Sequence, residues 1–381
     1  MISATTWRRV ASVLLLLLLV APAARSGHEL PVYPSYYPHE IEIATLAPDR
    51  AGPLLRDGKI HAYVGAAPRF AGAPPDTIQP VEPLGSLVTV RVNPTSPHGW
   101  EEASACAAVR AVARHIAAND PGVILHPYPI TPLHGDYLFH VDRAEDVRAS
   151  LLDATQAALA IEELKVKVTG TATRLLPSNA PPDSWDVEIQ EVSAANLVNS
   201  AMTAMNGWLG PPGLKTGWYQ AYLALGDLVD PNAKERVEAG LRRLQTGDFA
   251  DAAERINLER AFVAQLIGGC RKVVIGYTVK REYFNAEFSA GIENIGYDSL
   301  TGLNSPIFIR TVKLKDFPWN GWLALGIDGR PTAAWNPVAG FTDPFGRLMW
   351  SALGDPALLP APYGSAWMVN RVSDVQAAPA R

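Results

Sequence analysis

Short apolar runs alternate with amphipathic stretches through the first half of the chain. Residues 41–46, 60–64 and 87–92 are expected to be strands, because each run is rich in apolar and β-branched residues and ends at turn-forming residues. Residues 100–119 carry apolar side chains at helical spacing and stop at Asp120-Pro121-Gly122, which predicts a helix. Strands and helices that alternate with short connections predict a mainly parallel sheet with flanking helices.

The pattern continues from residue 142 to residue 192. Asp142 followed by Glu145 is the pattern of a capping box, and we expect a helix from there to about Glu163. Polar and apolar residues alternate over 164–169 and 185–192, which indicates two further strands. Between these strands, the Pro-rich segment 177–183 is typical of a linker, so a domain boundary is expected near it.

The second half of the chain has a different character. The sequence predicts helices over 194–208, 218–228, 234–244 and 249–267, and charge pairs at helical spacing on the last two are typical of a solvated face. Residues 273–288 and 308–315 favour extended structure, and the chain beyond Phe317 is rich in Trp, Pro and Gly with few helix signals.

The sequence therefore predicts a two-lobed α/β protein. The N-terminal lobe, residues 27–176, is expected to hold the mainly parallel sheet with flanking helices. The linker 177–183 would lead to a mixed α+β lobe, residues 184–381, with loops rich in Trp, Pro and Gly.

The first 26 residues have the pattern of an export signal. Arg8 and Arg9 precede an apolar run at 11–20, and small residues follow at 21–26, where cleavage is expected. A transmembrane anchor needs about 20 apolar residues, roughly twice the length of this run. We therefore expect cleavage of residues 1–26, export to the periplasm and no membrane span in the mature chain.

The balance of charge narrows the choice of partners. The formal net charge is −5, and cleavage of the signal would remove Arg8, Arg9 and Arg25 without removing an acid. The sequence contains no basic tract. This balance argues against nucleic acid and against anionic membrane surfaces as partners.

Familiar catalytic motifs are absent from the sequence, which contains no Gly-x-Ser-x-Gly elbow, no His-Glu-x-x-His and no Gly-x-Gly-x-x-Gly. All eight histidines lie between His28 and His140, so any imidazole chemistry belongs to the first part of the chain. Cys106 and Cys270 either form one disulfide or stay as buried thiols, since both lie in apolar surroundings.

Groups that bind metals or move protons are concentrated in residues 126–142. This stretch holds His126, His134, Asp136, His140 and Asp142 between prolines that stiffen the backbone. As a strand at ~3.3 Å per residue, it would put His134 and His140 about 20 Å apart, too far to share one ion. If a helical turn begins at Asp136 instead, Asp136 and His140 fall on one face at a spacing that suits two ligands of one ion.

Three interpretations of this stretch stay open. It can be a copper or zinc site with His126, His134, Asp136 and His140 as ligands. It can line a ligand pocket without a metal. It can also be purely structural, with Asp136 capping a turn, Asp142 capping the next helix and the histidines bonding backbone carbonyls.

Large aromatic rings supply the other half of a candidate ligand site. Tryptophans beside loop-forming residues are typical of surfaces that grip flat ligands, since one ring face buries much apolar area. The alternative is that these rings only pack a loop-rich domain. Together with the histidine stretch, they give the candidate ligand-binding residues Tyr128, His134, Asp136, Tyr137, Trp208, Trp218, Trp319, Trp322 and Trp335.

These features favour an exported binding protein that holds a small or amphipathic ligand in a cleft between two lobes. The α/β opening, in which residues 54–60 run into a strand, suits a two-lobed periplasmic binding protein at the level of fold. Such a protein would serve a membrane transporter or a periplasmic enzyme complex. The alternatives are a periplasmic copper- or zinc-binding accessory protein that uses residues 126–142, and a hydrolase that depends on carboxylates.

Overall fold

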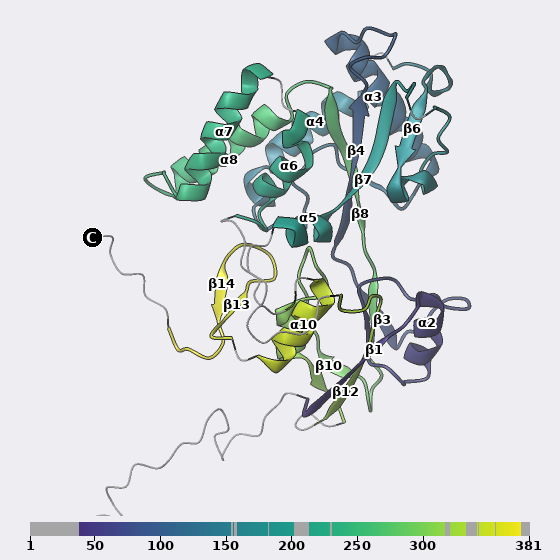
Figure 1. Cartoon of the computed structure of the whole chain (residues 1–381), viewed down its shortest axis with the longest axis vertical. Coiled ribbons are helices and arrows are strands. Elements are labelled where there is room, and N and C mark those ends of the chain that lie inside the picture. The colour runs from purple at the N-terminus through teal and green to yellow at the C-terminus, as the bar shows by residue number, and fades with distance from the viewer. Residues whose placement is uncertain are drawn as a thin grey trace, which may run out of the picture.

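Two lobes, one above the other in Figure 1, make up the described part of the chain, and each is built around a five-stranded sheet. The expected export signal, residues 1–26, lies outside this part. No helix within it is long and apolar enough to cross a membrane. The computed structural model describes residues 38–153, 155, 158–181, 183–201, 213–228, 231–316, 321–332, 341, 343–354 and 356–374.

The upper lobe contains a mainly antiparallel sheet, in which the β6–β7 pair alone is parallel. The prediction of a mainly parallel sheet is wrong for this lobe. The pairing differs from the prediction because β8, which comes from the second half of the chain, lies between β4 and β5 and runs antiparallel to both. The strand order is β5 (Ile124–Leu125), β8 (Lys272–Val279), β4 (Leu84–Val92), β7 (Val187–Ser193) and β6 (Val166–Thr169).

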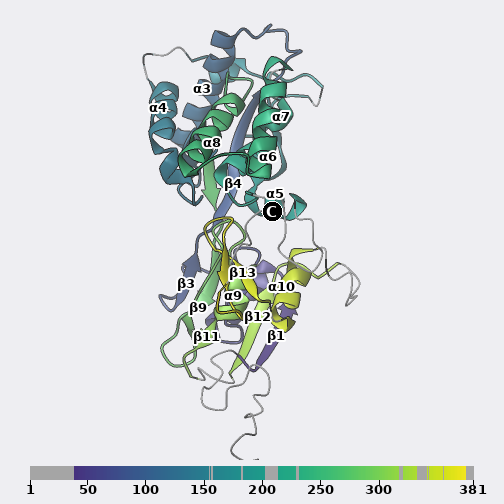
Figure 2. The ribbon, with the colours of Figure 1, turned by 90° about the vertical axis from the view of Figure 1, so that its left-hand side faces the viewer.

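Helices cover both faces of the upper sheet. On one face, α3 (Glu102–Asn119) packs against β4 through Val109 and Val112, as its apolar spacing predicted. Figure 2 shows the helices on the other face. They surround a second core that contains Trp218 and Phe262. They are α4 (Val141–Leu152), α5 (Ala194–Ala201), α6 (Gly217–Leu225), α7 (Pro231–Thr246) and α8 (Ala252–Leu266). Short 3₁₀ helices lie at η1 (Tyr137–Phe139), η2 (Ile161–Glu163), η3 (Gly170–Arg174) and η4 (Gly226–Leu228).

The lower lobe contains a mixed sheet. Strands β1, β12 and β2 run parallel, whereas β9 runs antiparallel to both β2 and β3. The predicted strands at 41–46 and 60–64 correspond to β1 and β2. The strand order is β1 (Glu40–Thr45), β12 (Trp322–Ile327), β2 (Ala62–Val64), β9 (Glu282–Asn285) and β3 (Ile78–Val81).

Helices also cover the lower sheet. Leu55 of α2 (Pro48–Arg56) packs with Tyr63, and Phe308 of α9 (Pro306–Thr311) packs in a separate core with Leu348 of α10 (Pro344–Leu353). The extended structure predicted for 308–315 is wrong in its first part, because Pro306 occupies a favoured first position of α9. Two small antiparallel pairs complete the lobe: β10 (Ile292–Asn294) with β11 (Lys313–Leu314), and β13 (Leu358–Pro360) with β14 (Trp367–Val369).

Both lobes contain strands from both halves of the sequence. The chain passes from the lower to the upper sheet at residues 82–83 and returns at residues 280–281. The N–H of Lys280 donates to the carbonyl of Pro83 at 2.9 Å, so the two crossings lie side by side. The expected linker 177–183 falls between β6 and β7, which pair with each other inside the upper sheet.

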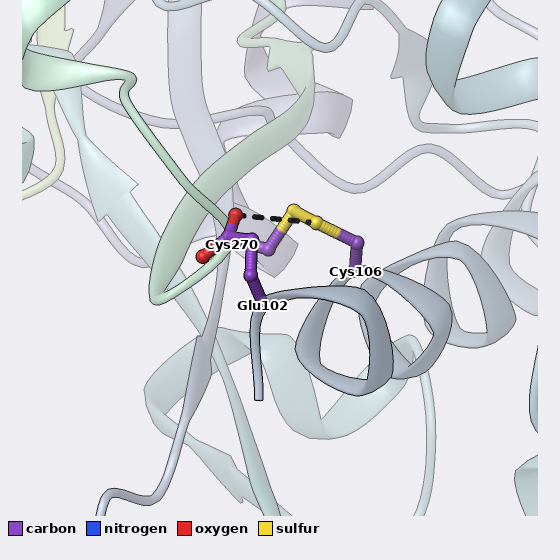
Figure 3. A group of neighbouring side chains, drawn as sticks. All are labelled: Glu102, Cys106 and Cys270. Carbon is purple, nitrogen blue, oxygen red and sulfur yellow. Dashed lines mark hydrogen bonds between the residues drawn. A yellow bond between two sulfur atoms is a disulfide. The ribbon is translucent and has the colours of Figure 1, made fainter. Parts of the chain in front are cut away.

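Cys106 and Cys270 form a disulfide, which decides between the two alternatives left by the sequence (Figure 3). The bond joins the beginning of α3 to the residues just before β8, across a separation of 164 residues. An oxygen of Glu102 lies 3.5 Å from the sulfur of Cys106. We call these three residues the disulfide group; its sulfur atoms are bonded to each other, so neither is available as a thiolate.

Candidate functional site

Residues 126–142 form a buried turn inside the upper lobe. Asp136 and His140 flank the 3₁₀ helix η1, so the turn geometry predicted from their spacing is correct and the strand alternative is wrong. Both side chains are buried, as are those of His126 and His134. Asp136 and the three histidines of the stretch therefore face the interior of the lobe, whereas Asp142 is exposed.

Arg260 holds this turn against α8. Its guanidinium donates to both carboxylate oxygens of Asp142, at 2.8 and 2.6 Å, and to the backbone carbonyl of Phe139. Asp142 was predicted to cap the following helix, but it lies inside the first turn of α4, and His140 occupies the N-cap position. That helix also ends at Leu152, well before the predicted Glu163.

Asp136 caps α6. One oxygen accepts a hydrogen bond from the N–H of Gly217 at 2.8 Å, and the other accepts one from the N–H of Trp218 at 3.3 Å. The first N–H groups of a helix have no partner within it, and that end favours negative charge. Gly217 allows this close packing, because a Cβ there would lie 2.4 Å from the side chain of Ile130.

His140 is fully buried, and one of its two ring nitrogens has no partner. Its Nδ1 lies 2.9 Å from the hydroxyl of Tyr128, whereas Nε2 has no hydrogen-bond partner among the described residues. Burial lowers the pKa of His140, against the opposing charge of Asp136, which favours the neutral ring. Burial also raises the pKa of Tyr128, so its hydroxyl stays protonated. When Nδ1 carries the proton, Nε2 presents a lone pair to the interior.

Glu259 of α8 is a further buried acid, and it is not among the residues predicted from the sequence. It is 2% exposed; Oε1 accepts from Arg255 at 2.9 Å, but Oε2 has no partner among the described residues. Burial raises the pKa of Glu259 to about 7; Arg255 opposes this shift, and the charge of Asp136 adds to it. The sequence did contain a signal for a buried acid, because Glu259 lies on the apolar face of α8 together with Phe262 and Leu266.

Asp136, His140 and Glu259 each bring one ligating atom to within 4.8 Å of the others. We call these three residues the buried acid–histidine group. Two carboxylates and an imidazole at this separation can share a proton or hold a cation.

The other two histidines of the stretch are bonded elsewhere. Nδ1 of His134 accepts from the N–H of Thr131 at 3.0 Å, so the neutral ring carries its proton on Nε2. That Nε2 is buried and has no partner among the described residues. Nε2 of His126 lies 2.8 Å from the carbonyl of Ile130, to which it donates. Burial lowers the pKa of both histidines.

The aromatic candidates are distributed over both lobes. Tyr137 is half-buried with its ring 5.8 Å from that of His126, while Trp218 packs in the upper-lobe core against Phe262. Trp322, at the beginning of β12 in the lower lobe, is 72% exposed. Three more candidates, Trp208, Trp319 and Trp335, lie outside the described residues.

Two segments of the upper lobe, at Lys215 and at Gly135, meet residues near the C-terminal end of the described chain. The ammonium group of Lys215, just before α6, donates to the carboxylate of Asp298 and to the carbonyl of Ala361. Gly135 approaches the carbonyl of Tyr363 so closely that a Cβ at Gly135 would lie 2.0 Å from that oxygen.

No family model matches the chain, and no curated protein matches it either. The solved structures that are similar over part of their length include the following three. NikZ from Campylobacter jejuni in complex with Ni(L-His) is 12% identical, with 65% of this chain and 56% of that chain covered and a TM-score of 0.31. NikA from Brucella suis in complex with Fe(III)-EDTA is 13% identical, with coverages of 71% and 56% and a TM-score of 0.36. The periplasmic EDTA-binding protein EppA is 11% identical, with coverages of 65% and 53% and a TM-score of 0.33.

The matched part of this chain spans little more than half the length of each of these structures. At TM-scores this low, the likeness says nothing about the ligand of this chain.

Proposed function

We propose that the protein is an exported binding protein that holds a small or amphipathic ligand between its two lobes. The observation that carries this proposal is the pair of adjacent crossings at 82–83 and 280–281. Two short segments side by side are a suitable hinge, because small backbone rotations in both can change the angle between the lobes.

The contacts around these crossings support a hinge along one edge of the junction. The guanidinium of Arg281 donates to Glu82 at 2.7 Å, across the two crossings. Glu282 is fully buried next to them and accepts from the N–H groups of Gly65 and Leu303. Leu300, from the loop before α9, packs into the upper-lobe core. In the proposed hinge, the Arg281–Glu82 bond and Leu300 hold the lobes together while the angle between them changes, and Glu282 anchors the second crossing to the lower lobe.

Polar contacts cross the junction elsewhere. Arg347 of α10 donates to the side chain of Asn199 on α5 at 3.3 Å, in addition to the contacts of Lys215 with Asp298 and the carbonyl of Ala361. Polar groups that can bond water instead of each other lose little when two surfaces separate. In the proposed cycle the lobes part at these contacts, admit the ligand beside Tyr137 and close over it.

The partner of such a protein would be a membrane transporter or a periplasmic enzyme complex that accepts the ligand. The pattern of residues 1–26 supports export, and the acidic mature chain fits neither nucleic acid nor an anionic membrane surface.

Measurement of the distance between the lobes tests the proposal. The two native cysteines are bonded to each other, so spin labels would attach only to cysteines that are introduced by mutation. Asp57→Cys, beside α2, and Lys234→Cys, on α7, put one label on an exposed site of each lobe. A ligand is first sought by screening amino acids, short peptides, sugars and fatty acids for compounds that raise the melting temperature. We expect such a ligand to shift and narrow the distribution of distances between the two labels.

A second label pair within the upper lobe serves as the control. Lys234→Cys with Glu145→Cys, on α4, should give the same distribution with and without the ligand. A stabilising compound that leaves the distance between Asp57→Cys and Lys234→Cys unchanged would contradict a ligand site between the lobes.

A further inference from the structure

We propose that the buried acid–histidine group is a binding site for a divalent first-row transition-metal ion, with Asp136, His140 and Glu259 as its protein ligands. This site lies inside the upper lobe and does not depend on the ligand proposed to bind between the lobes. It differs from the set suggested by the sequence, because Glu259 takes the place of His126 and His134.

Two of the three side chains each have one polar atom without a partner among the described residues. His140 and Glu259 are 0% and 2% exposed, yet Nε2 of His140 and Oε2 of Glu259 make no hydrogen bond with any described residue. Polar atoms buried in this way destabilise a fold unless something satisfies them. A cation between the two side chains would bond both atoms at once.

Hydrogen bonds to other residues already hold each of the three side chains in place. The hydroxyl of Tyr128 fixes the ring of His140 through Nδ1, and Arg255 fixes Glu259 through Oε1. The two N–H groups at the beginning of α6 fix Asp136. Such outer contacts orient metal ligands in known sites and raise the basicity of the coordinating histidine nitrogen. The three ligands are therefore in position before an ion arrives.

Electrostatic repulsion between the two buried acids also favours a bound cation. Asp136 and Glu259 are two buried carboxylates whose ligating atoms lie within 4.8 Å, and Arg255 is the cation that pairs with one of them. Like charges this close repel each other strongly in a medium of low polarity. A divalent cation removes that repulsion. A shared proton would do so as well, and the experiment below distinguishes these two cases.

The ligand atoms indicate which ions fit. One imidazole nitrogen and two carboxylates suit Zn²⁺ and Mn²⁺, whereas copper(I) prefers sulfur ligands. Both cysteines lie in the disulfide group and offer no thiolate. His134 does not add a second imidazole, because the N–H of Thr131 occupies its Nδ1 and the proton of the neutral ring lies on Nε2. Zn²⁺ and Mn²⁺ are therefore the probes.

Bound metal is first removed from the mature protein with a chelator, and the disulfide is kept oxidised. The protein is then titrated with Zn²⁺ and, separately, with Mn²⁺. Calorimetry and thermal unfolding are recorded for each ion. For at least one ion, we expect about one equivalent to bind and to raise the melting temperature, because an ion that binds only the folded state stabilises it. Glu259→Gln and His140→Gln should each weaken binding at least about 100-fold, since each removes a direct ligand.

Two variants are matched controls. His126→Gln replaces another buried histidine of the same stretch, and Glu254→Gln replaces another carboxylate of α8. Both should bind the ion with the affinity of the wild type. Under the shared-proton alternative, neither ion would stabilise the wild type, which would overturn the proposal. Binding that Glu259→Gln and His140→Gln leave unchanged would also overturn it.

X-ray absorption of the metal-loaded wild type keeps the proposal testable if the ligand variants do not fold. We expect a first shell of nitrogen and oxygen atoms with the scattering of a single imidazole. Sulfur in that shell, or more than one imidazole, would overturn the assignment.

Discussion

Among the described residues, the disulfide group and the buried acid–histidine group both place three ligating side chains within 4.8 Å of one another. They differ in what those atoms already bond. In the disulfide group the two sulfur atoms are joined covalently, and the carboxylate of Glu102 is exposed. In the buried group, one nitrogen and one oxygen have no partner among the described residues. Proximity alone therefore does not identify a site; the buried acid–histidine group combines proximity with buried atoms that have no partner.

The disulfide group is therefore expected to contribute to stability, whereas the buried acid–histidine group is proposed to bind an ion. The disulfide restricts the unfolded chain whether or not any ligand is present. The buried group carries an energetic cost in the folded protein that a bound ion would relieve. The predictions below test whether the two groups act in these different ways.

Loss of the disulfide should have the largest effect. Cys106→Ser combined with Cys270→Ser removes a bond that closes a loop of 164 residues, and long loops gain the most from closure. We expect the free energy of unfolding to fall by about 2–4 kcal/mol, measured by urea denaturation. The affinity for Zn²⁺ or Mn²⁺ should stay the same.

Glu102→Gln is the control for this variant, because it changes the third member of the disulfide group and leaves the bond intact. Glu102 is exposed, so we expect a change of less than about 0.5 kcal/mol. A loss of metal in the double serine variant would instead show that the disulfide group takes part in binding.

Replacement of Asp136 should have the next largest effect. In metal-free protein, Asp136→Ala leaves the N–H groups of Gly217 and Trp218 without their acceptor, at a cost of about 1–3 kcal/mol. Asp136→Asn keeps one oxygen and should recover part of this stability. Urea denaturation measures both, and equal stabilities for the two variants would contradict the role of Asp136 as a helix cap.

The sequence predicted individual elements better than their arrangement. The apolar spacing of α3 and the short runs of β1 and β2 are local signals, and the structure confirms them. The direction of the strands in the upper sheet is not local. It depends on β8, which is distant in the sequence from β4 and β5 but lies between them. Such pairing leaves no trace in the periodicity of any single segment.

The candidate site was predictable to the same extent. Spacing within one short stretch allowed its turn, with Asp136 and His140 on either side of η1, but left a strand as the alternative. Glu259 comes from α8, and only the packing of that helix against the turn brings it to His140. An acid on the apolar face of a helix was the available signal, and it could not indicate which residue the acid would meet.

A half-buried histidine outside both groups should give the smallest effect, and it is a reference for the pH dependence of stability. His61 lies in the lower lobe, and its Nδ1 accepts from the N–H of Ala324 at 2.9 Å, so that nitrogen is satisfied. Burial lowers the pKa of His61 from its usual 6.5, although the bond to Ala324 and the charge of Asp316 oppose the shift. The unfolded chain therefore takes up a proton at His61 more readily than the folded protein does.

The contribution of His61 to stability is thus complete well above pH 6.5 and is lost as the pH falls through that value. His61→Asn keeps an acceptor for Ala324 but does not titrate, so this variant should lose less stability than the wild type between about pH 7 and about pH 5. Urea denaturation at a series of pH values measures the difference. Because His61 touches neither group, His61→Asn should change the pH dependence of stability by the same amount when Cys106→Ser and Cys270→Ser are also present. If it does not, the stabilities of the two lobes do not respond independently to acid.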